Sequence, residues 1–352
     1  MRCYCVAEFG EPLHKVDQPT PHPKGTEALV RVSHCGVCHT DVHLWHGYYN
    51  LGGGRKLELS GRGVKPPFTP GHEVFGEIVS VGSDAPESAI GRRGVVFPWV
   101  GCGNCTCCHE GDGHLCATPR FLGVFSPGGY GDHVIVPSTR HVVEMPGVDP
   151  ALAATYACSG LTAFGALAKA RPFGADAPLV LIGAGGVGLT AVALLVAESA
   201  IGYTVVDIDD GKLGLARSLG APATVNARAP DAGDQIASAG APATVIDFVG
   251  SEETATLALG VLRKGGTYIV VGLYGGELKV PLPSIPLRVL RIQGSYVGNL
   301  ATFEELAALV STGRVPAIPV ERRAWHRCTE TLEALEAGQI NGRVVLEVGD
   351  GE

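Results

Sequence analysis

The sequence has little charge, few aromatic residues and almost no methionine. Of its 352 residues, 18% are charged, 6% are Phe, Trp or Tyr, and 2 are Met. Lys and Arg number 27 against 35 Asp and Glu, which gives a net charge of −8 without a long run of either sign. This balance argues against nucleic acid or an anionic membrane surface as the main partner. The length allows a large core and favours two domains over one.

The N-terminus lacks a recognisable targeting segment. MRCYCVAEFG has no basic stretch followed by an apolar core, so we expect no secretion, a cytoplasmic location and reduced thiols. One stretch, residues 177–197, carries no charge and imitates a membrane span. Because GAGGVG interrupts it, we expect a strand followed by a buried helix instead.

The local texture changes near residue 160. Residues 27 to 160 contain short β segments separated by Gly and Pro turns, which predict a β-rich, barrel-like unit. Beyond them, helical stretches alternate with strands such as PLVLIGAG, YTVVDID and ATVIDFVG, a pattern typical of a parallel doubly wound sheet. Past residue 297, the helical stretch TFEELAALVSTG precedes short strands. The sequence therefore predicts an α/β protein with a β-rich second unit.

A glycine-rich turn, LIGAGGVGL, joins a predicted strand to a predicted helix. Its residues are Gly183, Gly185, Gly186, Val187 and Gly188. The G-x-G-x-x-G pattern lets a pyrophosphate rest on free backbone N–H groups at a helix N-terminus. The next strand ends on Asp207, near the distance at which a carboxylate meets the adenosine ribose. Such a carboxylate repels a 2′-phosphate, which favours NAD over NADP, and Lys212 would lie near the same ribose.

Five of the eleven cysteines lie in GCGNCTCCHEGDGHLC, residues 101–116. In a reducing compartment, cysteines at this spacing are usually metal ligands, since thiolates around Zn²⁺ replace the core that a short loop lacks. Spacing favours the set Cys102, Cys105, Cys108 and Cys116. A set with Cys107 in place of Cys108, or with His109 or His114, stays open. A closed four-thiolate site would be structural rather than catalytic.

Other ligand-type residues are scattered over CGVCHTDVH at 35–43, GHE at 71–73 and CSGLT at 158–162. A catalytic zinc needs three protein ligands and an open position, and distant segments can supply them. Spacing alone does not choose between Cys35 and Cys38, and a single His72 would more often be an ordinary polar residue.

Taken together, the motifs GVCHTDVHLWHG, PGHEVFGEIVSVG, CSGLT, GAGGVG with VVDID, GSYVGN and the cysteine lobe occur in family order. The chain thereby resembles the zinc-dependent medium-chain alcohol dehydrogenases, most closely the microbial, tetrameric kind. The resemblance implies a Rossmann domain that binds NAD over residues 158–296. It also implies a GroES-like catalytic domain over 1–157 and 297–352 with a structural zinc lobe at 101–117. Two zinc ions per chain and a homotetramer, or alternatively a dimer, are expected.

The resemblance also assigns roles to residues. It implies that Cys38, His72 and Cys158 hold the catalytic zinc, and that Glu73 can approach the metal during ligand exchange. Asp41 is expected to orient the His72 imidazole, as zinc-bound histidines generally require. In the lobe the resemblance selects Cys102, Cys105, Cys108 and Cys116, and leaves Cys35 and Cys107 as spare thiols.

The implied reaction is oxidation of a primary or secondary alcohol with hydride transfer to NAD. Zinc would lower the pKa of the alcohol hydroxyl. Thr40 begins the family's hydroxyl relay, which ends on His43. His39 faces the NAD pyrophosphate in the family, with Arg343 as its partner.

The residues that line the substrate pocket are the ones that the sequence indicates least clearly. The candidates to line it suggest an apolar, possibly aromatic alcohol: Trp45, Tyr49, Trp99, Phe121 and Tyr296. The segment 48–65 is expected to be a long loop over the cleft, either controlling access or lying at a subunit contact.

Three rival functions share some of these sequence features. A zinc-free quinone or enoyl reductase should lack the ligands and the lobe. A nucleic-acid-binding zinc module predicts a basic face, whereas CTCCHEGDGHLC has two acids and no Lys or Arg. A glutathione-dependent formaldehyde dehydrogenase is the closest rival in chemistry, and an assay with formaldehyde and glutathione would identify it.

Overall fold

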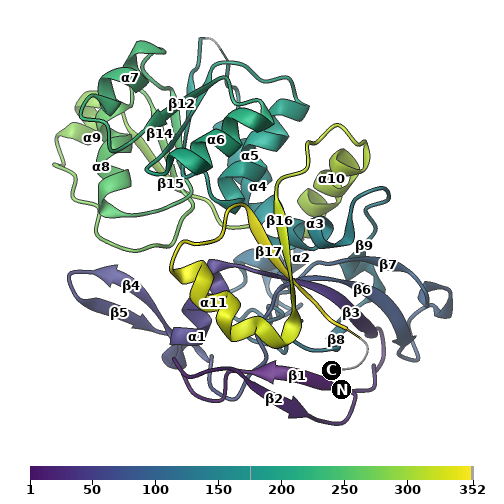
Figure 1. The fold of residues 1–352 in the computed structure, drawn as a ribbon. Helices are drawn as coiled ribbons and strands as arrows, with labels where there is room; N and C mark the ends of the chain where they lie inside the picture. The colour runs from purple at the N-terminus through teal and green to yellow at the C-terminus, as the bar shows by residue number, and fades with distance from the viewer. Residues whose placement is uncertain (175, 350–352) are drawn as a thin grey trace.

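The computed structural model describes residues 1–174 and 176–349, which form two units joined side by side (Figure 1). The chain builds most of the β-rich unit first, then the parallel-sheet unit, and finally returns to the first unit with its last strands and helix. Both described ends of the chain therefore lie on the same unit.

The parallel-sheet unit is a six-stranded sheet in the order β12-β11-β10-β13-β14-β15. Its strands are β10 (Leu179–Ile182), β11 (Tyr203–Asp207), β12 (Ala223–Asn226), β13 (Thr244–Asp247), β14 (Thr267–Val270) and β15 (Arg291–Gly294). The order reverses between β10 and β13, which is where doubly wound sheets bind dinucleotides. The uncharged stretch at 177–197 is β10 followed by helix α5 (Gly186–Ala197), as predicted.

The β-rich unit is built on a seven-stranded sheet in the order β16-β17-β3-β6-β7-β9, with β8 paired to β3. Its strands are β3 (Ala28–Val37), β6 (Glu73–Val81), β7 (Arg93–Val96), β8 (His133–Val136), β9 (Val142–Val143), β16 (Val320–Ala324) and β17 (Arg343–Glu347). Two small hairpins flank it, β1 (Arg2–Cys5) with β2 (His14–Asp17) and β4 (Tyr48–Gly52) with β5 (Arg55–Glu58). The predicted pairing of a doubly wound sheet with a β-rich unit is confirmed.

Helices fill the space between and around the sheets. They are α1 (His39–His46), α2 (Thr106–His109), α3 (Pro150–Thr155), α4 (Leu161–Ala170), α5, α6 (Asp210–Leu219), α7 (Ala232–Ser238), α8 (Glu252–Val261), α9 (Ser284–Arg288), α10 (Leu300–Ser311) and α11 (Cys328–Glu336). The stretch predicted to be helical beyond residue 297 is α10.

One helical run, Pro150–Ala170, is apolar and long enough by composition to cross a membrane, but 83% of its most apolar window is buried inside the protein. It comprises α3, a π-helical turn at Tyr156–Gly160, and α4. The largest apolar cluster runs from this helix into the parallel sheet, so the run is a core element that joins the two units.

Candidate active site

Four side chains converge where β3, β6 and the π-helical turn meet. Ligand-type atoms of Cys38, His72, Glu73 and Cys158 lie within 4.8 Å of one another, and all four residues are buried. They come from sequence positions up to 120 residues apart, so only the fold brings them together. The structure thus gathers the three predicted ligands of a catalytic zinc.

Cys38 is held by the first turn of α1. It occupies the N-cap position, where its sulfur accepts a hydrogen bond from the Thr40 backbone N–H at 3.3 Å. The Asp41 carboxylate reaches back to accept from the Cys38 N–H at 2.9 Å, which completes a capping box. Cys35, by contrast, lies within β3 with no exposure to solvent. The helix start therefore explains why Cys38, and not Cys35, faces the cluster.

His72 is buried with both ring nitrogens lacking a hydrogen-bond partner among the described residues. Its Nδ1 lies 3.3 Å from Asp41 Oδ1, a close contact whose geometry falls short of a hydrogen bond. Burial lowers the pKa of His72, but the charges of Asp41 and Cys38 outweigh burial and raise it well above its usual range. A buried imidazole with an unsatisfied nitrogen is costly, and a cation bound at Nε2 would remove that cost.

Cys158 lies on the π-helical turn Tyr156–Gly160. π-turns are rare and often occur at functional sites because they redirect a side chain within a helix. The hydrogen bond between Cys158 and Cys38 raises the pKa of Cys158 and lowers that of Cys38. Two neighbouring thiols such as these lose their protons when they bind a divalent cation.

Glu73 and Arg343 form a buried ion pair beside the cluster. The Arg343 guanidinium donates to Glu73 Oε2, and the Ser159 N–H donates to Glu73 Oε1 at 3.2 Å. Glu73 has no solvent exposure and Arg343 has 5%. Burial raises the pKa of Glu73 to about 7, against the opposing charge of Arg343. Glu73 lies near the metal site, as expected, but its oxygens already have partners.

The donor set fits zinc. Two thiols and one imidazole are ligands that zinc prefers, and three protein ligands leave the open position of a catalytic site. The orphaned His72 nitrogens and the convergence of both sulfurs on the same buried site are the observations that support this fit.

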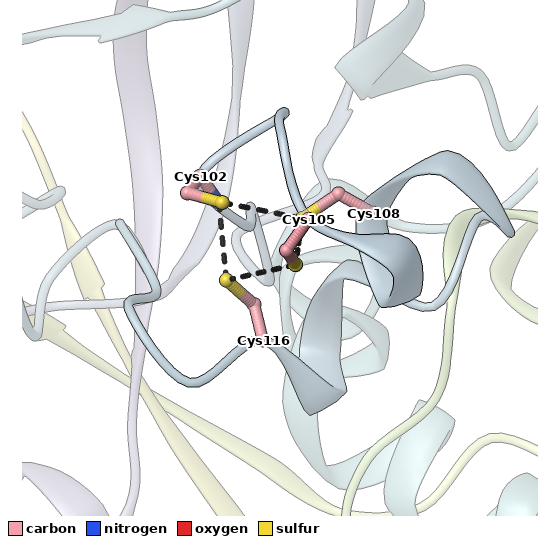
Figure 2. A group of neighbouring side chains, drawn as sticks. All are labelled: Cys102, Cys105, Cys108 and Cys116. Atoms are coloured by element: carbon pink, nitrogen blue, oxygen red, sulfur yellow. Dashed lines mark hydrogen bonds between the residues drawn. The ribbon is translucent and has the colours of Figure 1, made fainter.

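The cysteine lobe forms a second group of possible ligands (Figure 2). The sulfurs of Cys102, Cys105, Cys108 and Cys116 converge from a loop and two short helices and lie within 4.8 Å of one another. Three sulfur–sulfur distances are 3.5, 3.7 and 3.9 Å. Four thiolates at about 2.3 Å from one zinc would be about 3.8 Å apart, so the geometry matches a closed tetrahedral site. Cys107 lies outside this group, which confirms the four-cysteine prediction.

Glycines shape the turn between β10 and α5. Gly183 has φ +97°, and a Cβ on Gly188 would lie 1.8 Å from the Gly183 carbonyl oxygen. A side chain at Gly185, the N-cap of α5, would meet no atom within 4 Å. The open side of the turn is therefore free for a phosphate, while the other side is packed too closely for any side chain.

The residues around this turn suit an NAD pyrophosphate and ribose. Asp207 ends β11, where its carboxylate accepts from the Ala184 N–H at 2.7 Å. Arg343 packs against Gly186, since a Cβ there would lie 2.2 Å from Arg343 Cδ. The Arg343 Nε is buried without a hydrogen-bond partner among the described residues. A phosphate oxygen at the turn could satisfy this donor.

The remaining predicted cofactor and relay residues lie on two helix starts. His39 and Thr40 begin α1, and Lys212 lies in the first turn of α6, where its N–H donates to Asp209. The His43 ring lies 4.6 Å from the Tyr49 ring, and burial lowers the pKa of His43. The described contacts do not test the roles expected for these four residues.

Three of the five predicted pocket residues form one aromatic cluster. The Trp99 ring lies 5.3 Å from Phe121 and 5.7 Å from Tyr296, and 5.5 Å from the His72 ring. The Trp99 Nε1 donates to the Ala157 carbonyl at 2.8 Å, beside Cys158. These rings therefore form a wall next to the metal site.

The other two pocket candidates lie elsewhere. The Tyr49 ring contacts the His43 ring, and the pKa of Tyr49 is raised to about 12 by burial and by the nearby Cys38 and Cys158. Trp45 instead packs into the core of the β-rich unit and donates to the Glu11 carbonyl at 2.6 Å. The structure does not bring Trp45 to the aromatic wall.

The segment 48–65 is largely a hairpin, β4–β5, that contacts the loop after β14. Arg55 pairs with Glu277 at 2.5 Å, and a Cβ on Gly52 would lie 2.8 Å from the Gly276 backbone. The hairpin thus bridges the two units of the chain, in the region where β4 and β5 project in Figure 1.

Sequence reasoning missed one buried acid near the cofactor turn. Asp247 ends β13 without solvent exposure, accepts from the Val249 and Gly250 N–H groups, and accepts from the hydroxyls of Thr254 and Tyr268. It fixes the loop opposite Gly183. Its signal was visible in ATVIDFVG, where an acid ends an otherwise apolar strand.

Comparison with known proteins agrees with this geometry. Residues 24–147 match the family model of the alcohol dehydrogenase GroES-like domain, and residues 186–312 match that of zinc-binding dehydrogenases. An NAD-dependent alcohol dehydrogenase of Sulfurisphaera tokodaii is 36% identical over 98% of this chain and 99% of that protein.

Solved structures share the fold. The alcohol dehydrogenase of the archaeon Aeropyrum pernix superposes with a TM-score of 0.88 at 30% identity, over 99% of this chain and 100% of that one. An acetophenone reductase of Geotrichum candidum in complex with NAD gives 0.84 at 27% identity, over 99% and 97%. With two family models and a relative matched along nearly its whole length, the chain belongs to the zinc-containing medium-chain alcohol dehydrogenase family.

Proposed function

We propose that this protein catalyses the reversible oxidation of a primary or secondary alcohol to an aldehyde or ketone, with hydride transfer to NAD. The observation that carries the proposal is the buried cluster of Cys38, His72 and Cys158 beside an aromatic wall and a dinucleotide turn. The NAD dependence of the Sulfurisphaera tokodaii relative and the carboxylate of Asp207 support NAD as the cofactor.

Each group of residues has a distinct task in this reaction. Zinc held by Cys38, His72 and Cys158 would supply Lewis acidity that lowers the pKa of an alcohol hydroxyl, and NAD would accept the hydride. Asp41 orients the His72 ring. Glu73, next to the ligands, is the acid that can approach the metal site during ligand exchange.

A proton must leave the pocket with each oxidation. Thr40 lies two residues after the ligand Cys38, and His43 lies about one helical turn later on α1. Burial lowers the pKa of His43, so its imidazole is neutral near pH 7 and can accept a proton. We assign the relay to these two residues.

Cofactor binding is assigned to the α5 turn and its neighbours. The backbone N–H groups of the turn and the Arg343 guanidinium would hold the pyrophosphate, with His39 beside it. Asp207 and Lys212 would contact the adenosine ribose. We further propose the division into residues 158–296 for cofactor binding and residues 1–157 with 297–352 for catalysis.

The aromatic wall favours an apolar, aromatic alcohol as substrate. Trp99, Phe121 and Tyr296 present ring surfaces near the metal site, and the Geotrichum candidum relative is named for an aromatic ketone. Tyr49 would lie at the edge of this pocket.

Self-association is also proposed, as a homotetramer or, failing that, a dimer. The edge strand β15 is exposed along its whole length, and apolar residues around it are exposed, including Leu282 (78%), Leu287 (71%) and Val289 (53%). An exposed edge strand beside exposed apolar side chains is an association surface. None of the eleven cysteines forms a disulfide within the described chain, which supports a reducing, cytoplasmic location.

The function is tested by screening NAD reduction over aliphatic, benzylic and secondary alcohols, with zinc content measured in parallel. Formaldehyde with and without glutathione forms a separate arm that identifies the formaldehyde-specific alternative. Absence of turnover with every alcohol, by protein that holds about two zinc ions per chain, would contradict the proposal. Light scattering on the same sample determines the oligomeric state.

A further inference from the structure

One side-chain hydrogen bond links the cysteine lobe to the segment that follows β15. Asn299 Nδ2 donates to Asp112 Oδ1 at 2.9 Å, although the two residues are 187 positions apart. The bond joins the lobe to the residues that carry Tyr296 into the aromatic wall.

Asn299 uses both ends of its amide. As N-cap of α10, its Oδ1 accepts from the N–H and the hydroxyl of Thr302 at 2.9 and 2.8 Å. The nitrogen is then left for Asp112. Aspartate caps a helix as well as asparagine does, so capping alone does not require the amide nitrogen.

Asp112 is held firmly inside the lobe. Its N–H donates to the Cys107 carbonyl at 2.7 Å, and its carbonyl accepts from the Leu115 N–H at 2.8 Å. Cys108 and Cys116, which close the zinc site, lie next to these two residues. The carboxylate of Asp112 is therefore fixed relative to the lobe.

The segment between Tyr296 and Asn299 is strained. Val297 has φ +32°, a conformation that is unfavourable for a β-branched residue and persists only where the surroundings hold it. Tyr296 itself is 46% exposed, and its ring contacts the rings of Trp99 and Phe121. If the anchor at Asn299 were lost, relaxation at Val297 would move Tyr296.

The positions of the other two rings of the aromatic wall, Trp99 and Phe121, also depend on the lobe. Trp99 and Phe121 flank it in the sequence, and Arg120 ties the flanks together through its N–H to the Val100 carbonyl at 2.8 Å and its Nε to the Gly101 carbonyl at 3.2 Å. All three aromatic rings are thus held in position relative to the lobe.

We propose that Asp112 and Asn299 are positioning residues that set the width of the substrate pocket by anchoring Tyr296 to the structural zinc lobe. The inference rests on the proposed function, because it assumes that alcohols bind against Trp99, Phe121 and Tyr296. It gives the structural zinc site a role in substrate selection in addition to stability.

The test uses a reciprocal pair of substitutions. Asn299→Asp keeps the helix cap but sets a carboxylate against Asp112. Asp112→Asn alone keeps an oxygen acceptor for Asn299, and the double variant restores one hydrogen bond with donor and acceptor exchanged. Glu110→Gln is the control for lobe charge, since Glu110 is an exposed lobe acid whose carboxylate has no hydrogen-bond or ion-pair partner among the described residues.

For Asn299→Asp we expect the KM for benzylic alcohols to rise about fivefold to tenfold, which corresponds to the roughly 1 kcal/mol that one hydrogen bond typically contributes. The kcat and the KM for ethanol should change by less than about twofold, because a small alcohol does not reach Tyr296. Asp112→Asn, the double variant and Glu110→Gln should all stay within about twofold of the wild type.

Zinc content, thermal unfolding and amide hydrogen exchange are measured on the same proteins. Faster exchange at Val297 and Gly298 in Asn299→Asp, reversed in the double variant, supports the inference without reference to turnover. Unchanged exchange and an unchanged ratio of benzylic to ethanol KM in an active enzyme would overturn it.

A further variant distinguishes a role of this hydrogen bond in lobe stability from its role in the pocket. Asp112→Ala removes the acceptor without altering the cap of α10. If both Asp112→Ala and Asn299→Asp lose zinc, the bond holds the lobe and not the pocket, and the inference is wrong. If instead the wild type oxidises no alcohol, the proposed function fails, while the exchange data still decide whether the bond positions residues 296–299.

Discussion

Gly36 leaves the space in which the Glu73–Arg343 ion pair forms, so Gly36→Ala should disrupt that pair. The two residues Gly36 and Glu73 are partners across β3 and β6. A Cβ on residue 36 would lie 2.0 Å from Glu73 Oε2 and 2.9 Å from Glu73 Cβ. The carboxylate must therefore leave its position when the methyl group is added.

The expected loss of stability follows from the buried charge of Arg343, which is left unpaired when Glu73 moves. Arg343 is 5% exposed and would keep its charge without its partner. Breaking a buried ion pair on one side costs about 3–5 kcal/mol. Replacing glycine by alanine in a strand returns about 0.5–1 kcal/mol through the unfolded chain. The free energy of unfolding should then fall by about 2–4 kcal/mol.

Urea denaturation of the wild type and Gly36→Ala, at equal zinc content, measures this difference. Gly214→Ala on α6 is the matched control, since its added methyl meets no atom within 4 Å. It should be neutral or raise stability by about 0.5–1 kcal/mol. A Gly36→Ala protein within about 0.5 kcal/mol of the wild type would refute the steric argument.

Three further predictions concern the lobe, pH and cofactor release. Cys108→Ser should lower the melting temperature and reduce zinc from about two to about one per chain, whereas Cys107→Ser should change neither, and the reverse outcome would refute the choice of ligands. Burial lowers the pKa of His141 from 6.5 to about 4. Between pH 6.5 and pH 4, His141 is therefore protonated in the unfolded chain but neutral in the native state. The free energy of unfolding falls by about 3 kcal/mol over this range. Denaturation curves of His141→Gln should lack this part of the acid sensitivity, and an equal pH slope in both proteins would contradict it. His39→Arg should slow NADH dissociation about fivefold in stopped-flow experiments, because a guanidinium holds phosphate more firmly than an imidazole, so an unchanged or faster rate would count against a phosphate contact at this position.

The sequence was most informative where function depends on local spacing. The turn of Gly183 and Gly188 needs glycine because the backbone carbonyl of one occupies the side-chain space of the other. The cysteine lobe likewise gathers its ligands within one loop, so that spacing alone favoured Cys108 over Cys107. Both features could be predicted because their partners lie within one short segment of the chain.

Contacts between distant segments could not be predicted from local patterns. Nothing in the neighbourhood of Glu73 indicates that Arg343, 270 positions later, takes up its carboxylate. The alternation of a strand does not show which of Cys35 and Cys38 leaves the sheet, because that depends on where α1 begins. Trp45 was a reasonable pocket candidate by composition, yet the far face of α1 carries it into the core.

The π-helical turn at Tyr156–Gly160 has a consequence for how this chain can change in length. Such a turn holds one residue more than the same stretch of α-helix, and each residue turns an α-helix by about 100°. Deleting one residue there would rotate Cys158 away from Cys38, or else rotate the buried face of α4 away from the core. Homologues should therefore tolerate insertions and deletions on either side of Pro150–Ala170 but none within it, although its apolar sequence alone would place no such limit on length.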